Sequence, residues 1–185
     1  MMTMNADKNR AGILDIAKSS ICIALLSVAS YVVMPLPFTP VVLSMHTVAV
    51  NIIGLIMRPK NAAYTIAVYI VMGLLGLPVF SVGTGGAAKL FGPTGGFYFG
   101  FLFAVIAISL LKGRQISFKR YLLVTAGVGM PVQYLSGMLF IFFYNDFNIR
   151  AAAASVVPFI PGDVVKCIIA SVVAVALNRA DNKCN

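Results

Sequence analysis

Residues 159–178 read FIPGDVVKCIIASVVAVALN, an apolar run that carries one acidic and one basic residue, Asp163 and Lys166, near its start. A helix of roughly 20 mostly apolar residues is long enough to cross a bilayer. The rest of the chain has the same character, because 60% of its 185 residues are hydrophobic and only 10% are charged. Soluble domains are about a quarter charged. The composition therefore predicts an integral membrane protein.

Apolar segments separated by Pro, Gly or basic residues predict an all-α protein with six transmembrane helices. No soluble module interrupts them, so residues 1–185 are expected to form a single membrane domain. Residues 1–11 are expected to be a cytoplasmic tail, because no small-residue cleavage site of a signal peptide follows them at the right distance. The predicted spans cover about residues 12–34, 41–57, 61–77, 93–111, 119–144 and 159–178.

Basic residues alternate between the connections of these spans. Only Lys89 and Arg150 lie on one side of the predicted membrane, and Lys166 lies within the last span. Cytoplasmic loops of membrane proteins carry the excess of Lys and Arg, so both termini are predicted to be cytoplasmic. The eleven basic residues on that side are Lys8, Arg10, Lys18, Arg58, Lys60, Lys112, Arg114, Lys119, Arg120, Arg179 and Lys183.

The connections on the opposite, extracellular side are longer and less regular. Irregular backbone at membrane depth is tolerated where it lines a cavity. We therefore expect a ligand site near the extracellular face of the cell membrane. The connections concerned are residues 35–40, 78–92 and 145–157.

Several function classes are excluded by the residue types present. The formal charge of +9 is explained by cytoplasmic loops, so we expect no nucleic-acid partner. The cysteines Cys22, Cys167 and Cys184 lack the spacing of metal ligands, and His46 is the single histidine of the chain. No metal site is therefore expected. The glycine-rich segment has no Gly-Lys-Ser/Thr, so no nucleotide site is expected. No catalytic constellation is present, and we predict that the chain is not an enzyme.

Asp163 and Lys166 are the first candidates for ligand binding. Their spacing of three residues places them on one face of a helix. Ionisable residues inside a membrane helix are energetically expensive and usually functional. A structural alternative is mutual neutralisation, with Lys166 extending toward the membrane interface. Because Asp163 can accept from N–H donors and Lys166 can donate to a carbonyl or carboxylate, we predict that they bind the polar head of a small ligand.

The segment 73–101, GLLGLPVFSVGTGGAAKLFGPTGGFYFGF, supplies the second group of candidates. Its glycines interrupt the helical pattern and allow the backbone to approach a ligand or a helix closely. The glycines between Gly95 and Gly100 are expected to serve helix packing. His46 is a second-rank candidate, since a lone histidine is more often structural. The predicted ligand-facing residues are Ser81, Gly83, Gly85 and Gly86 in the loop, with Phe80, Phe97, Tyr98, Gln133 and Tyr134 around them.

A stripe of small residues runs along the first span. Ala17, Ser20, Ala24 and Ser27 recur at spacings of three and four, which places them on one helical face. Small residues allow another membrane helix to approach closely. The partner of this small-residue stripe is either another helix of the chain or a different subunit.

Three separated motifs resemble the BioY family, the biotin-specific S components of energy-coupling-factor (ECF) transporters. They are GLPVFSVGTGG (76–86), FGPTGG (91–96) and PFIPGDVVK (158–166). The stretches 35–50 and 58–78 are similar to the second and third helices of that family. His46 stands where the family usually has Gln, and Val82 occupies a loop position that is often small or polar.

The resemblance implies a six-helix S-component bundle in a prokaryotic plasma membrane that binds biotin from outside. Asp163 and Lys166 would contact the head group of biotin, and the loop 80–86 would close part of the pocket. The small-residue stripe would dock on the transmembrane coupling subunit, and two ATPase subunits would use ATP, so this chain needs no cofactor. An alternative is a stand-alone secondary transporter that couples a small vitamin-like solute to an ion gradient through Asp163 and Lys166.

Overall fold

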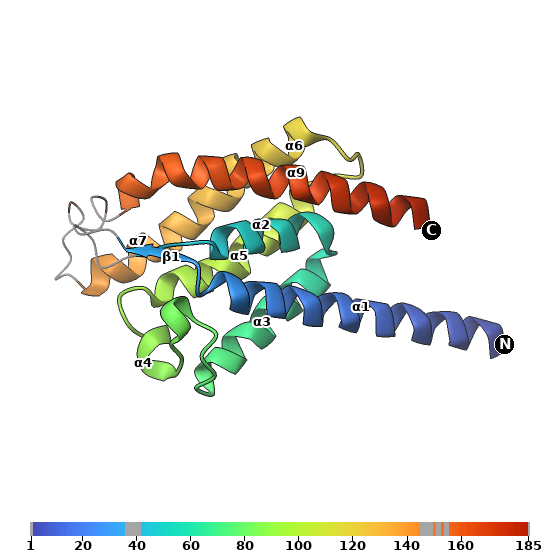
Figure 1. Cartoon of the computed structure of the whole chain (residues 1–185), viewed down its shortest axis with the longest axis horizontal. Coiled ribbons are helices and arrows are strands. Elements are labelled where there is room, and N and C mark those ends of the chain that lie inside the picture. The colour runs from blue at the N-terminus through green and yellow to red at the C-terminus, as the bar shows by residue number, and fades with distance from the viewer. Residues whose placement is uncertain (1, 36–41, 145–149, 151–152, 154–155, 185) are drawn as a thin grey trace.

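The structure of the chain, a computed structural model, describes residues 2–35, 42–144, 150, 153 and 156–184. Helices run roughly along the long axis of the molecule, and both termini lie at the same end (Figure 1). A small hairpin and the short helix α4 lie at the other end. The helices are α1 (Met2–Ala29), α2 (His46–Ile56), α3 (Pro59–Leu74), α4 (Ala87–Leu90), α5 (Gly95–Leu111), α6 (Phe118–Val124), α7 (Met130–Tyr144) and α9 (Ile160–Cys184); the strands are β1 (Val33–Pro35) and β2 (Val42–Ser44).

The helix α5 lies at the centre of the bundle, where it packs against α2, α3 and α7, while α9 packs against α2 and α6. Ile53, Ile66 and Val105 are fully buried between these helices. Large apolar side chains also cover the outside, such as Ile21 at 70% and Leu135 at 66% exposure. Exposed apolar surface on this scale is unusual for a soluble monomer and fits an environment of lipid.

Three helical segments of the described chain are long and apolar enough to cross a membrane. They are Gly12–Ala29, Phe118–Tyr144 and Val157–Asn182. His46–Ile56 and Gly95–Leu111 are apolar but shorter. The all-helical, apolar character predicted from the sequence is therefore confirmed, with helix ends that differ from the predicted spans.

The largest difference lies between the first two predicted spans. The prediction of helix up to residue 34 and again from residue 41 is wrong, because β1 and β2 form an antiparallel hairpin with Val33 opposite Ser44. Pro35 disfavours a helical conformation of the residue before it, and β-branched Val favours a strand. Most of the predicted connections 35–40 and 145–157 lies outside the described residues. At the N-terminus, α1 begins at Met2, so residues 2–11 continue the helix.

The fifth predicted span is interrupted by a π-helical turn, Thr125–Gly129, between α6 and α7. The N–H of Met130 bonds to the carbonyl of Thr125, five residues back. Pro131 follows and has no N–H to continue a regular α-helical ladder, which explains the wider turn. The turn sets the direction of α7, which carries Gln133 and Tyr134.

The carbonyl groups at the end of α2 receive side-chain donors from two other helical segments. Lys112 Nζ donates to Leu55 O at 2.9 Å and to Met57 O at 2.6 Å, and Asn178 Nδ2 donates to Leu55 O at 3.2 Å. The last carbonyls of a helix otherwise lack partners. Burial lowers the pKa of Lys112 to about 8. These contacts join α2 to the segment after α5 and to α9 at the end that holds the termini.

Gly96 brings α5 close to α7, as the sequence predicts for this group of glycines. A Cβ at Gly96 would contact the carbonyl oxygen of Ser136 and the side chain of Phe140. We expect Gly96→Ala to lower the thermal midpoint of unfolding, because overpacking a tight contact costs about 1–3 kcal/mol. Gly127→Ala is the matched control, since no atom lies within 4 Å of a Cβ there. Equal melting temperatures of the two variants in detergent would contradict this role of Gly96.

Candidate ligand-binding site

A cavity opens at the end of the bundle that holds the hairpin. It contains about 690 Å³ of empty space, part of which is continuous with the outside. This size is within the usual range for sites that bind small molecules. Its lining comes from β2, α2, the 3₁₀ turn Ser81–Gly83, α4, α5, α7, the 3₁₀ turn Val157–Phe159 with the residue before it, and α9. The lining residues are Ser44, Thr47, Ser81, Lys89, Thr94, Phe97, Tyr98, Phe101, Gln133, Tyr134, Val156, Phe159, Asp163 and Lys166.

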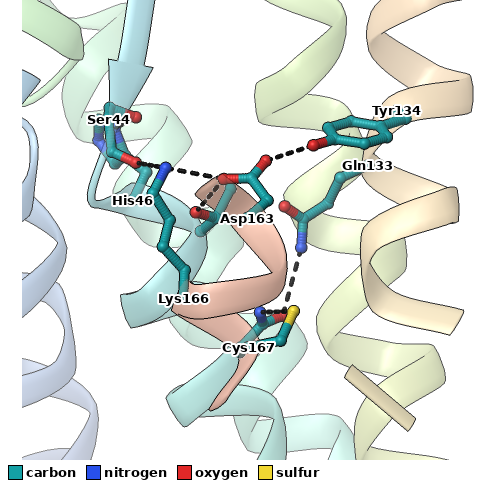
Figure 2. Close-up of polar contacts among 9 residues, drawn as sticks. Ser44, His46, Gln133, Tyr134, Asp163, Lys166 and Cys167 are labelled. Atoms are coloured by element: carbon teal, nitrogen blue, oxygen red, sulfur yellow. Dashed lines mark hydrogen bonds and ion pairs between the residues drawn. The ribbon is translucent and has the colours of Figure 1, made fainter. Parts of the chain in front are cut away.

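Asp163 and Lys166 form an ion pair on the first turns of α9, with 2.7 Å between Asp163 Oδ1 and Lys166 Nζ. Their side chains are only 7% and 6% exposed. Tyr134 donates its hydroxyl to Asp163 Oδ2 at 2.5 Å, and Lys166 Nζ donates to Ser44 O at 2.7 Å (Figure 2). Thr47 Oγ1 lies 3.5 Å from Asp163 Oδ1. The pair is therefore held by α7, α2 and β2 as well as by its own helix.

The position of Asp163 in its helix suits an acidic side chain. It lies in the first turn of α9, where the positive end of the helix dipole stabilises an anion. A buried pair must be well hydrogen-bonded, because removing two charges from water is expensive. The hydrogen bonds to Tyr134 and Ser44 satisfy only part of the hydrogen-bonding capacity of the two charged groups. A carboxylate has about four lone-pair sites and an ammonium has three donors, so both groups keep capacity for a ligand in the cavity.

A second layer of polar side chains lies below the pair. Gln133 Nε2 donates to Asn51 Oδ1 at 3.4 Å, and Asn51 Nδ2 contacts Cys167 Sγ at 3.5 Å. Gln133 lines the cavity and is otherwise buried. Anchoring by Asn51 restricts the Gln133 side chain, so its amide is presented to the cavity in a fixed position.

His46 is fully buried behind the cavity wall. Tyr69 donates its hydroxyl to Val79 O at 2.5 Å, so the same oxygen must accept the hydrogen of His46 Nε2, 2.7 Å away. His46 Nδ1 then accepts from Ser44 Oγ at 3.1 Å. Within the described chain, His46 is not among the residues that line the cavity. It therefore supports Ser44, whose carbonyl receives Lys166.

The loop 80–86 contributes one residue to the cavity lining, Ser81. Tyr98 is bound to this residue, because its hydroxyl oxygen accepts from Ser81 N at 3.0 Å. Phe80 is fully buried behind Tyr98, with 4.3 Å between the ring centroids. Gly83 and Gly86 have positive φ, which glycine adopts without strain. In the described chain, Gly83, Gly85 and Gly86 shape the loop without lining the cavity.

The structure brings Asp163, Lys166, Ser81, Gln133 and Tyr134 together, and Tyr98 and Phe97 with them. Other lining residues were not singled out from the sequence. Lys89 could have been identified from the sequence, because Lys89 and Arg150 are the two basic residues predicted to lie on the extracellular side. The hydroxyl and apolar residues gave no such signal. The lining residues without a prior assignment are Ser44, Thr47, Lys89, Thr94, Phe101, Val156 and Phe159.

Comparison with known proteins shows the family of the chain. The BioY family matches residues 2–183. The biotin transporter BioY of Thermotoga maritima is 33% identical over 165 residues, which cover 89% of this chain and 95% of the relative. The biotin transporter BioY2 of Lactococcus lactis subsp. cremoris is 32% identical over 159 residues, covering 85% and 86% of the two chains.

A solved structure shares the fold. It is the crystal structure of the S-component for biotin from an ECF-type ABC transporter, with a TM-score of 0.86 and 24% sequence identity. The match covers 92% of this chain and 94% of the solved chain. The bundle described above is therefore the S-component fold, and the chain belongs to the BioY family of membrane transport proteins.

Proposed function

We propose that this chain is the biotin-binding subunit of a vitamin uptake transporter, a transport protein and not an enzyme. The observation that carries the proposal is the buried Asp163–Lys166 pair, which faces a cavity of small-molecule size at one end of the bundle. Relatives that cover most of the chain are named biotin transporters. A binding subunit of this kind would present its ligand to partners that supply the energy.

The chemistry of biotin suits the lining of the cavity. Its ureido ring offers N–H donors and a carbonyl acceptor, which complement the lone pairs of Asp163 and the donor of Lys166 that no described residue uses. Its thioether ring and aliphatic chain are apolar, and Phe97, Phe101 and Phe159 supply apolar walls. Polar anchors in an otherwise apolar cleft are typical of small-molecule sites.

The orientation proposed for the chain is that both termini are cytoplasmic and the cavity faces outward. The termini lie at one end of the bundle, toward which the α2–α3 turn and the α5–α6 connection also point (Figure 1). Arg58 and Lys112 lie in these two connections, and Arg120 lies in the first turn of α6. The cavity lies at the opposite end, with Lys89. Basic residues favour the cytoplasmic side, which supports this orientation. The single membrane domain would cross the bilayer six times, through α1, α2, α3, α5, α6 with α7, and α9.

The proposed partner is a transmembrane coupling subunit that docks on the small-residue stripe, with two ATPase subunits that use ATP. Ala17, Ser20 and Ala24 are exposed, and Ser27 is half-buried. The buried residues Cys22 and Leu26 lie on the other face of α1. Most of the stripe is therefore left uncovered by the bundle. Its serines bond to carbonyls of their own helix, so a neighbouring helix would meet no unsatisfied hydroxyl.

Reconstitution of the chain alone into vesicles tests the proposal. We expect tight binding of radiolabelled biotin without accumulation, with or without an imposed proton gradient. Accumulation driven by the gradient would instead show a stand-alone secondary transporter that uses the Asp163–Lys166 pair as its ion-linked switch. Failure of the wild-type chain to bind biotin at all would contradict both the substrate and the role.

A further inference from the structure

Lys89 is the third charged residue on the cavity wall. Among the described lining residues, Asp163, Lys166 and Lys89 are the charged ones. Asp163 and Lys166 are paired with each other, so their formal charges cancel. Lys89 is partly exposed and forms no salt bridge with any described residue. Among the described residues, the lining of the cavity therefore carries one positive charge without an ion-pair partner, and this charge attracts an anionic group.

The surroundings of Lys89 differ from those of the ion pair. Lys89 lies on α4, which packs against α3 and α5, whereas Asp163 and Lys166 lie on α9, which packs against α2 and α6. The helices α4 and α9 lie on opposite sides of the bundle in Figure 1, and both contribute residues to the lining of the cavity. Thr94, the residue before the first turn of α5, also lines the cavity. The positive end of the α5 dipole adds to the attraction for an anion there.

We propose that Lys89 binds the carboxylate of the ligand and makes the site selective for a free acid. This inference rests on the proposed function, since biotin carries its carboxylate at the end of the aliphatic chain opposite the ureido ring. The ring would bind Asp163 and Lys166, the chain would cross the apolar wall, and the carboxylate would reach Lys89. Thr94 and Ser81 lie on the same lining, and the Ser81 hydroxyl is hydrogen-bonded to that of Tyr98 at 3.1 Å.

The test compares biotin with biotinamide, which is neutral and of nearly the same size. Calorimetric titration of the purified wild-type chain should give about tenfold or greater preference for biotin, the scale of a charge-assisted hydrogen bond. In Lys89→Gln the preference should fall to near one, through loss of affinity for biotin while affinity for biotinamide is kept. Lys89→Arg should restore most of the preference. Lys60→Gln, an exposed lysine outside the cavity lining, is the matched control and should behave as wild type.

Each outcome bears on a different claim. Wild-type affinity of Lys89→Gln for biotinamide shows that the variant is folded, so a lost preference reports on the carboxylate. An unchanged preference in Lys89→Gln, or equal binding of both ligands by the wild type, would overturn the role of Lys89 and leave biotin binding intact. Binding of neither ligand by the wild type would instead remove the proposed function.

Discussion

Replacing Asp163 by Asn is expected to weaken biotin binding by at least about 2 kcal/mol, or roughly thirtyfold in affinity. The substitution removes the anion that accepts from Lys166 and from Tyr134, and it replaces a charged acceptor for the ligand by a neutral amide. Isothermal calorimetry of the purified protein measures the change. Unchanged affinity would remove Asp163 from the binding site.

Two further variants separate binding from folding. Asp163→Asn leaves the ammonium of Lys166 buried without its partner, and a broken buried pair destabilises a protein by about 3–5 kcal/mol. Combining it with Lys166→Met removes the orphaned charge, so the double variant should recover stability but not biotin binding. The matched control is Asp181→Asn, which breaks an exposed salt bridge to Lys18 at 2.9 Å and should leave affinity unchanged.

Replacing Ala24 by Trp is expected to abolish assembly with the coupling subunit, and with it biotin uptake, while biotin affinity stays at the wild-type value. Ala24 is exposed in the middle of the small-residue stripe and lies away from the cavity lining. A large ring there would hold an approaching helix away from α1, because close approach depends on small residues. Co-purification of the tagged chain with its partner subunits, together with uptake by intact cells, measures the effect.

Leu25→Trp is the control for that experiment. Leu25 is also exposed on α1, but successive residues of a helix point about 100° apart, so it lies off the small-residue stripe. This variant should assemble and transport normally. If Ala24→Trp co-purifies as well as Leu25→Trp does, the stripe is not the docking surface.

Much of the helical architecture could be predicted from the sequence, because long apolar runs bounded by Pro, Gly and basic residues leave few alternatives. Helix α5 begins at Gly95, close to the predicted residue 93, and ends at the predicted residue 111. The hairpin of β1 and β2 could not be predicted in this way. Val33 and Val42 continue the apolar runs on either side, and hydropathy does not distinguish a short strand from a helix end.

The polar centre of the site could be predicted for a different reason. Asp163 and Lys166 stand out because charges in a membrane helix require an explanation. Ser44 and Thr47 do not stand out, since hydroxyl groups are common in such helices and only the packing of β2 and α2 against α9 brings them to the cavity. Phe80 was predicted to face the ligand, but it packs against Tyr98 behind the cavity wall. The sequence does not distinguish these two positions for an aromatic residue at the start of a loop.

Native mass spectrometry of the purified chain, released from detergent without added ligand, tests most directly whether the cavity around Asp163 and Lys166 holds biotin. We predict a population with an additional mass equal to that of biotin in the wild type, and loss of this population in the double variant Asp163→Asn with Lys166→Met. A wild-type chain that carries no such mass even after incubation with biotin, or a double variant that retains it, would contradict the account.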